Sequence, residues 1–170
     1  MRHWLALLAI CASPAAFAQG DAPVEGFDPK IAEICADQGG EDCVGLAASH
    51  CIETSEIGFS NVGMGFCVGA ELDWWDTRLN AVYRELSEAE AKSDAEIAEL
   101  GGALAPSSAP DLKAMQRAWI AYRDALCEKY EASQWGGGSG TYLGVANCML
   151  HETARQVRVL EGYMRQKDER

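Results

Sequence analysis

Positive charge and histidine are both scarce in this chain. It has 14 Lys and Arg residues against 26 Asp and Glu residues, and only three His, so its formal net charge at pH 7 is −12. A surface of this charge repels nucleic acid and anionic lipid, and it speeds the encounter with basic partners at low salt. We therefore expect no nucleic-acid partner and favour a basic protein partner. An acidity that only keeps the protein soluble is an equally good explanation.

Sequence signatures of common catalytic sites are also absent. There is no His-Glu-x-x-His of a zinc hydrolase and no Gly-x-Ser-x-Gly of a serine hydrolase. The glycine-rich run 136–140 lacks the lysine of a phosphate-binding loop. Acidic pairs such as Asp73 and Asp76 are expected by chance among so many acids, so they do not indicate a glycosidase. We predict no enzyme, no cofactor and no metal site.

Long apolar runs are missing except at the start, where the run is too short to cross a bilayer. Basic residues at 2–3 precede apolar residues 4–10, and 16–18 reads Ala-Phe-Ala, a small-x-small cleavage site. We predict a signal peptide at 1–18, a mature chain that begins at Gln19 and export to the periplasm.

Cleavage would remove Arg2 and no acid, so the mature net charge would be −13. Cys11 follows Ile10, where a lipoprotein signal requires a small residue, so we expect no lipid anchor. The later chain has no run for stable membrane insertion. Residues 19–27, with Gly, Pro and acids, are expected to form a flexible lead.

Six cysteines remain after the predicted cleavage. They are Cys35, Cys43, Cys51, Cys67, Cys127 and Cys148. An even number in an exported protein indicates three disulfides, and the absence of Cys-x-x-Cys argues against a zinc site.

The spacing of the cysteines suggests how they pair. Cys127 and Cys148 fall late in one predicted helix and early in the next, so a helical hairpin would bring them together. Closing a loop of roughly 20 residues would contribute about 3 kcal/mol. Cys35 and Cys43 flank an earlier hairpin turn, which leaves Cys51 with Cys67. The sequence does not fix the pairing among these last four.

Helical patterns and loop signals alternate along the chain, and no strand pattern is sustained. Asp28-Pro29 is a typical helix start, and Gly39-Gly40 a typical end. The predicted helices cover about 28–38, 41–53, 66–100, 110–133 and 141–167. The third either continues to Leu100 or restarts at Ser87. We predict an all-α fold, an antiparallel bundle of three main helices with a short N-terminal helical hairpin.

This pattern also predicts a domain organisation. A Cys-rich helical hairpin and loop would occupy 28–65, and the helical domain would occupy 66–168. Two apolar stripes would face each other inside the domain. One consists of Leu72, Trp75, Leu79, Val82 and Leu86, and the other of Met115, Trp119, Tyr122 and Leu126.

Arg123 and Asp124 lie beside the aromatic positions, where a charge needs a partner. We favour a structural network over a substrate site, with Arg123 either stacked on an aromatic ring or paired with a group on a facing helix, such as the long helix. The candidates are Asp76, Asn80 and Tyr83, which share one helical face. Trp135, beside Gly136 and Gly137, is the best candidate for an exposed recognition aromatic.

Two motifs carry a family resemblance. LNAVYREL at 79–86 and QRAWIAYRDALC at 116–127 precede a glycine-rich loop and then Cys148, Thr153 and Arg155. Over residues 67–160 this pattern resembles the lysozyme inhibitor LprI-like N-terminal domain family. Its motif residues correspond here to Asn80, Tyr83, Gln116, Arg117, Trp119, Tyr122, Arg123 and Asp124.

The resemblance implies a small helical domain of the bacterial envelope with lysozyme as its basic partner. We therefore expect a periplasmic acidic binding protein that inhibits lysozyme by steric and electrostatic occlusion, through loop 55–65 or loop 135–140. The alternative is an envelope scaffold module for another peptide, protein or cell-wall ligand. A peptidoglycan enzyme would instead need a deep pocket with two converging carboxylates or His151. The sequence predicts no oligomeric state.

Overall fold

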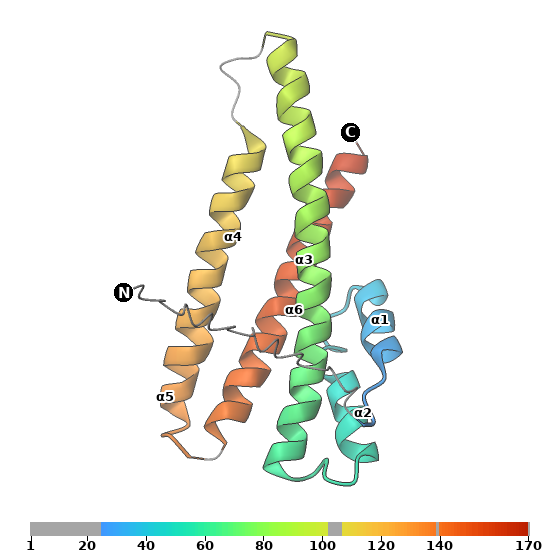
Figure 1. The fold of residues 1–170 in the computed structure, drawn as a ribbon, viewed down its shortest axis with the longest axis vertical. Coiled ribbons are helices and arrows are strands. Elements are labelled where there is room, and N and C mark those ends of the chain that lie inside the picture. The colour runs from blue at the N-terminus through green and yellow to red at the C-terminus, as the bar shows by residue number, and fades with distance from the viewer. Residues whose placement is uncertain (1–24, 102–106, 139, 170) are drawn as a thin grey trace, which may run out of the picture.

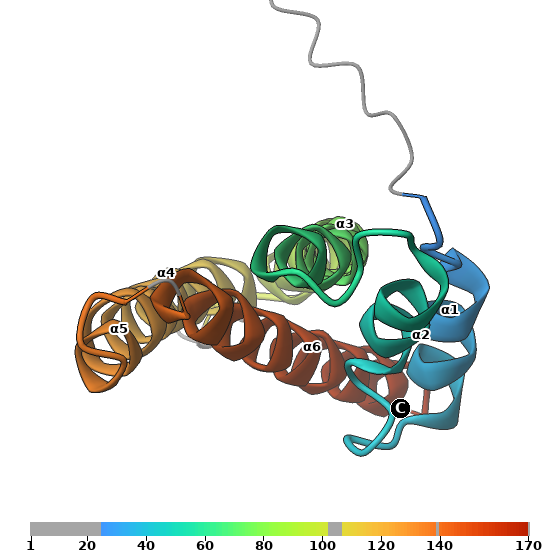
Figure 2. The ribbon, with the colours of Figure 1, turned by 90° about the horizontal axis from the view of Figure 1, so that it is seen from below.

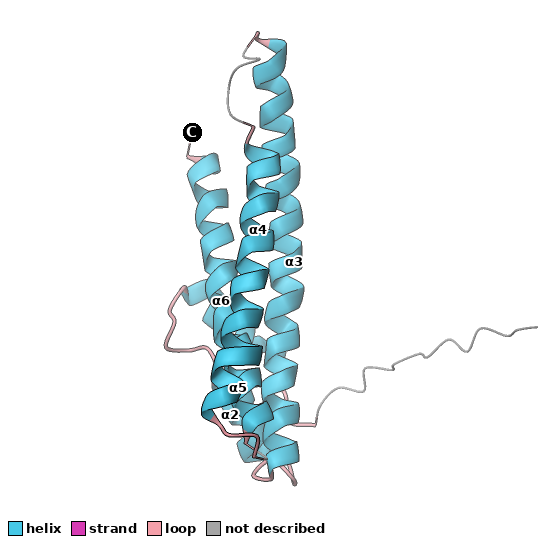
Figure 3. Cartoon of the chain, turned by 90° about the vertical axis from the view of Figure 1, so that its left-hand side faces the viewer, coloured by secondary structure: helices cyan, strands magenta, loops and turns pink. Residues whose placement is uncertain are grey.

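The computed structural model describes residues 25–101, 107–138 and 140–169. This described part consists of helices and loops and contains no strand (Figure 3). Long helices run side by side, and two short helices lie against one flank of them (Figure 1). The prediction of an all-α bundle with an N-terminal helical hairpin is confirmed. The predicted signal peptide at 1–18 and most of the lead at 19–27 lie outside the described residues.

The N-terminal hairpin consists of α1 (Pro29–Gln38) and α2 (Leu46–Thr54). The Asp28 carboxylate caps α1 by accepting a hydrogen bond from the Lys30 backbone N–H at 3.0 Å. Gly39, with φ of 69°, ends the helix in the left-handed region. Both ends of α1 therefore follow from local sequence chemistry.

A buried carboxylate holds α2 against the bundle. Glu71 of the next helix is 0% exposed and accepts hydrogen bonds from the backbone N–H groups of Gly45, at 2.8 Å, and Ala48, at 2.7 Å. The indole Nε1 of Trp75 donates to the same side chain at 3.3 Å. These N–H groups at the start of α2 have no partner within their own helix, so Glu71 supplies the cap from another element.

Helix α3 (Asn61–Glu99) spans 39 residues and forms the long axis of the molecule. It begins about five residues before the predicted start, because the Ser60 hydroxyl caps it by accepting from the Gly63 N–H at 3.0 Å. The glycines at 63 and 65 had indicated a loop, but both lie buried in the helix. The helix is continuous through Ser87, so the restart considered there does not occur.

The chain then returns through α4 (Ser108–Asp124), a π-helical segment η1 (Ala125–Glu131) and the short α5 (Ala132–Gln134). The sequence had predicted one uninterrupted α-helix over 110–133. A π-helical turn adds a residue per turn and so shifts the faces of the residues that follow.

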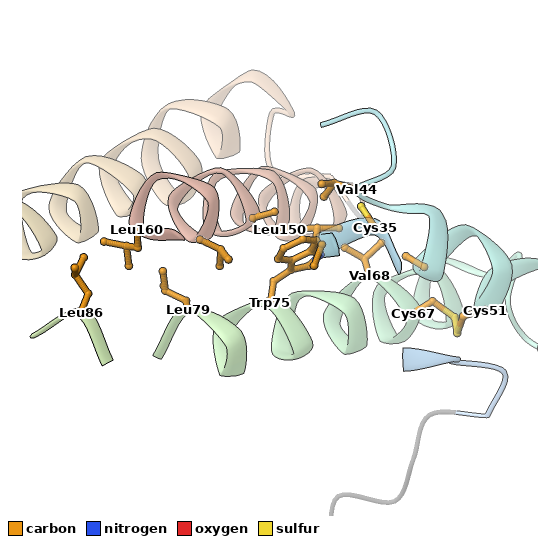
Figure 4. Close-up of a cluster of buried hydrophobic side chains, with 14 of the residues drawn as sticks. Cys35, Val44, Cys51, Cys67, Val68, Trp75, Leu79, Leu86, Leu150 and Leu160 are labelled. Atoms are coloured by element: carbon orange, nitrogen blue, oxygen red, sulfur yellow. A yellow bond between two sulfur atoms is a disulfide. The ribbon is translucent and has the colours of Figure 1, made fainter. Parts of the chain in front are cut away.

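Helix α6 (Thr141–Asp168) runs back along α3. Seen from below, α4 and α5 lie on one side of the α3–α6 pair, and α1 and α2 lie on the other (Figure 2). Apolar side chains fill the space between α3 and α6. The close-up shows Trp75, Leu79 and Leu86 of α3 opposite Leu150 and Leu160 of α6 (Figure 4). One cluster includes buried residues from both 28–65 and 66–168, and the division between those segments stays a prediction.

The predicted stripe on α4 needs one correction. Met115 and Trp119 pack against the core, but Tyr122 is 55% exposed. The buried face instead includes Gln116, which is 8% exposed, and the partly buried Arg123. The hydrophobic pattern predicted Tyr122 on the buried face. Gln116 and Arg123, polar residues that have partners of their own, lie there instead.

All three disulfides are present with the predicted pairing. Their Cα–Cα distances are 5.4, 5.6 and 5.5 Å, within the usual range for a disulfide. The pairs are Cys35–Cys43, Cys51–Cys67 and Cys127–Cys148.

Candidate functional site

Both loops that the sequence marked as candidates lie at one end of the bundle. The α2–α3 connection and the α5–α6 connection both lie at the bottom of Figure 1, away from the C-terminal end of α3. Tyr142 of α6 links the two, since its hydroxyl lies 3.5 Å from the Asn61 carbonyl oxygen at the start of α3. We call this end of the molecule the loop end.

Large apolar side chains project from the loop end beside α2. Ile57, Phe59, Val62 and Phe66 are each more than half exposed, and Phe59 reaches 77%. We call these four residues the apolar end cluster. A hollow of about 360 Å³ adjoins it, lined by Glu25, Ser55, Glu56, Ile57, Gly63, Phe66 and Cys67. Single exposed apolar residues are ordinary, but four within one short segment are a candidate interaction surface.

Close backbone packing holds this loop in place. A Cβ atom on Gly58 would lie 2.0 Å from the Ile52 carbonyl oxygen, and one on Gly63 would lie 2.0 Å from the Ile57 carbonyl oxygen. The Cys51–Cys67 disulfide joins α2 to α3 just behind the loop. The apolar cluster is therefore presented by a constrained turn, which lowers the entropy lost on binding.

The loop end lacks positive charge. No Lys or Arg occurs between Lys30 and Arg78, or between Lys129 and Arg155. The first interval contains nine acids: Glu33, Asp37, Glu41, Asp42, Glu53, Glu56, Glu71, Asp73 and Asp76. An apolar cluster within such a segment suits a partner with apolar and basic groups.

A second hollow lies at the same end, on the side of the α5–α6 loop. Trp135, 54% exposed, stands at its edge. The hollow has a volume of about 420 Å³ and is lined by Leu126, Glu131, Trp135, Leu143, Gly144, Asn147, Cys148, His151 and Glu152. Gly136 and Gly137, with φ of 65° and 77°, form the turn that follows Trp135.

This second hollow contains acids and His151, the groups that a peptidoglycan enzyme would need. Glu152 is 9% exposed and accepts a hydrogen bond from Arg155 Nη1, so its carboxylate already has a cationic partner. His151 lines the hollow and is exposed. In the described residues, no group of three or more His, Cys, Asp or Glu side chains is placed to hold a metal ion.

The family-motif residues on α3 and α4 divide between the core and the surface. The Gln116 amide oxygen accepts from Gln156 Nε2 at 2.9 Å, a buried contact between α4 and α6. Tyr83 of α3 packs against the core, whereas Asn80 and Arg117 are exposed. None of the motif residues lines either of the two hollows.

Arg123 and Asp124 form a local network. Arg123 Nη2 donates to Asp124 Oδ1 at 2.9 Å, and its guanidinium lies 5.0 Å from the centre of the Trp119 ring. The stacking on an aromatic ring is therefore present, as one of the two predicted alternatives. The other alternative, a pairing across to α3, is replaced by Asp124 of the same helix, and Asn80 of α3 donates to Asp76 at 2.9 Å.

Two charged groups with shifted pKa values lie outside the loop end. Backbone N–H groups of Ala109 and Ser108 donate to Asp94 and lower the pKa of its carboxyl group. Burial lowers the pKa of Arg158, which lies over the Trp75 ring. Both therefore serve the fold. Throughout the described helices, none is long and apolar enough to cross a membrane.

Comparison with known proteins identifies a family. A family model described as lysozyme inhibitor LprI matches residues 51–160, which confirms the resemblance seen in the two motifs. An uncharacterized protein of Rhizobium meliloti (strain 1021) is 32% identical over 107 residues, 62% of this chain and 74% of that protein. No solved structure gives a significant match. The matched span includes the loop end.

Proposed function

Because the chain belongs to the lysozyme inhibitor LprI family, we propose that it is an exported inhibitor of lysozyme-type muramidases. Its binding surface is the apolar end cluster. The observation that carries this assignment is the placement of four exposed apolar side chains within a segment that has no Lys or Arg.

Inhibition follows from occlusion. Phe59 is the most exposed member of the cluster, and it enters the substrate cleft of the enzyme. The adjacent Glu53 and Glu56 face basic groups at the rim of that cleft. A buried apolar anchor supplies affinity, and the acidic surroundings raise the association rate at low salt. No bond is made or broken by the inhibitor.

Export is part of this proposal. The signal peptide at 1–18 would deliver a mature protein of net charge −13 to the periplasm, the compartment in which three disulfides form and persist. Ile10 before Cys11 supports an unanchored form, since lipidation requires a small residue there.

A cell-wall lysis assay with several basic lysozymes tests the inhibition. We expect the purified mature protein to slow lysis at low salt and to do so less as salt rises, because screening weakens the charge attraction. Phe59→Ser should weaken inhibition at least tenfold, as expected when a central apolar anchor is lost. Leu100→Ser is the matched control, because Leu100 is 89% exposed at the opposite end of α3.

Two results would overturn the proposal. One is undiminished cell-wall lysis by every lysozyme tested, with the protein in excess at low salt. The other is an equal loss of inhibition in the Phe59 and Leu100 variants, which would place the binding surface elsewhere. If lysozyme is unaffected, capture of periplasmic proteins at low and high salt would identify the partner of the alternative, a scaffold module for another ligand.

A further inference from the structure

The hollow beside Trp135 shares no lining residue with the apolar end cluster or its hollow. It therefore needs an explanation of its own. Its chemistry differs as well, since it combines one large aromatic ring, two leucines and several uncharged or acidic polar groups.

The Trp135 ring lies flat along the first turn of α6. A Cβ atom on Gly144 would be 2.3 Å from the indole Nε1, and one on Gly140 would be 3.4 Å from the ring carbon Cε3. The ring thus extends over one helical turn between two glycines, which leave room for it. The residue is still 54% exposed, so part of the ring is open to solvent while its edges lie against the start of the helix.

Polar groups surround this aromatic surface. Asn147 donates one amide hydrogen to the Leu143 carbonyl oxygen at 3.0 Å, which leaves its own oxygen and a second hydrogen for another partner. Glu131 and His151 line the same hollow. Leu126 and Leu143 add apolar surface between them. An open aromatic face with a few directed polar groups is typical of small-molecule sites that bind flat, amphipathic rings.

Charge restricts the class of ligand. No Lys or Arg occurs between Lys129 and Arg155, and the two acids of the hollow are Glu131 and Glu152. A phosphate, sulfate or carboxylate group would therefore find no Lys or Arg among the residues that line this hollow. An uncharged ring with hydroxyl groups fits, because hydroxyls both donate to carboxylates and accept from amides.

The π-helical segment shapes one wall of the site. Leu126 and Glu131 both belong to η1, and Cys148 across the hollow is joined to Cys127 of the same segment. Isolated π-helical turns occur frequently at functional sites. Here the wider turn and the disulfide together fix the wall opposite the Trp135 ring.

We propose that this hollow binds a neutral N-acetylated sugar, with the sugar ring stacked on Trp135. The acetamido methyl group packs on Leu126 and Leu143, and the hydroxyl and amide groups bond to Glu131 and Asn147. The site is independent of lysozyme inhibition. It would let the protein contact an N-acetylhexosamine glycan while the apolar end cluster holds a protein.

Titration of the ¹⁵N-labelled mature protein with N-acetylated chitotriose tests the site by NMR. The four tryptophans of the mature protein give four indole N–H signals, and Trp135→Phe identifies the one from position 135. We expect that signal to shift in a saturable way. Cellotriose, which lacks acetamido groups, should bind more weakly, and trigalacturonate, which carries carboxylates, should not bind.

Two variants separate binding from folding. Gly144→Ala introduces a good helix former, so the helix should remain intact. Its methyl group would lie where the Trp135 ring now lies, so the ring must move and sugar binding should fall about tenfold. Phe59→Ala alters only the other surface and should bind the sugar as the parent does. A Trp135 signal unmoved by chitotriose, or an equal response to trigalacturonate, would overturn the proposal. Neither result bears on lysozyme inhibition, which Phe59→Ser tests.

Discussion

Glu71 shows how much of this fold depends on one side chain. Its two carboxylate oxygens cap α2, and α2 leads directly into the loop that carries Ile57 and Phe59. An isolated buried carboxylate is strongly unfavourable, whereas one that accepts several N–H groups is stabilised. The position of the apolar end cluster is thus tied to an acid that never reaches the surface.

We expect Glu71→Gln to destabilise the protein by about 2 kcal/mol, because the amide nitrogen cannot accept from a backbone N–H. Urea denaturation measures the change. Glu88→Gln is the control, since Glu88 lies exposed on the same helix. A stability loss of the same size in both variants would contradict the role given to Glu71.

Asp94 makes the stability of the folded protein depend on pH in the acid range. Its lowered pKa means that the folded state favours the ionised carboxylate, so its contribution is present above the ordinary pKa of Asp, about 4. The contribution is lost as pH falls through the lowered pKa. We expect Asp94→Asn to lower the melting temperature at neutral pH, with the gap to the parent closing in acid. Asp42→Asn, at an exposed position, should show no such closing gap.

At the scale of elements, the start of α3 depends on the absence of a side chain. A Cβ atom on Gly65 would lie 0.9 Å from the Tyr142 hydroxyl oxygen, so α6 packs directly against the backbone of α3. Gly69, one turn later, has nothing within 4 Å of its Cβ position. The two glycines differ in their surroundings and should differ in their tolerance of substitution.

Gly65→Ala should destabilise the protein by about 2 kcal/mol through overpacking. Gly69→Ala should instead stabilise it by about 0.5–1 kcal/mol, because Ala favours a helix more than Gly does. Thermal denaturation of both variants checks this. Tyr142→Ala should recover part of the loss when combined with Gly65→Ala. Additive effects in that double mutant would exclude a direct contact.

The same region shows what sequence patterns could and could not predict. The helices near 28–38 and 141–167 follow from local caps and turns, and the Cys127–Cys148 disulfide follows from cysteine spacing. Cysteine spacing suggested the other two disulfides but did not fix their pairing. The start of α3 does not, because glycines at 63 and 65 are common in loops and their real role depends on a helix far along the chain. Likewise, the bond from Glu71 to Gly45 joins residues 26 positions apart.

The candidate sites remain predictions, and they combine local and distant features in the same way. Trp135 and both loops were identified from composition, since exposed aromatics beside glycines are typical of recognition loops. The burial of Gln116 and the pairing of Arg123 with Asp124 depend on the rotation of α4 around its axis. A shift of one position in the stripe was enough to place Tyr122 wrongly.

For the molecule as a whole, covalent constraint is concentrated away from the turn between α3 and α4. None of the three disulfides includes a residue of 87–124 or 150–169. The last turns of α3, residues 91–99, are mostly exposed. Stability should therefore differ between the two ends, since local opening is easiest where few apolar contacts hold a helix.

Hydrogen exchange tests this difference. We expect amides of 92–99 to exchange fast with or without a reducing agent. Amides of α2 and the first turns of α3 should be slow and become faster after reduction, because the Cys51–Cys67 link contributes about 3 kcal/mol. The comparison requires a reduced protein that is still helical by circular dichroism. Faster exchange after reduction that is restricted to the amides of 92–99 would contradict this expectation.

The orientation of α6 has a practical consequence. This helix starts at the loop end and carries its C-terminal turn toward the opposite end of the molecule (Figure 1). A sensor surface or fluorescent label attached there would hold the protein upright, with both hollows directed into solution. A label attached at Glu25, in the wall of one hollow, would instead hide the surface to be measured.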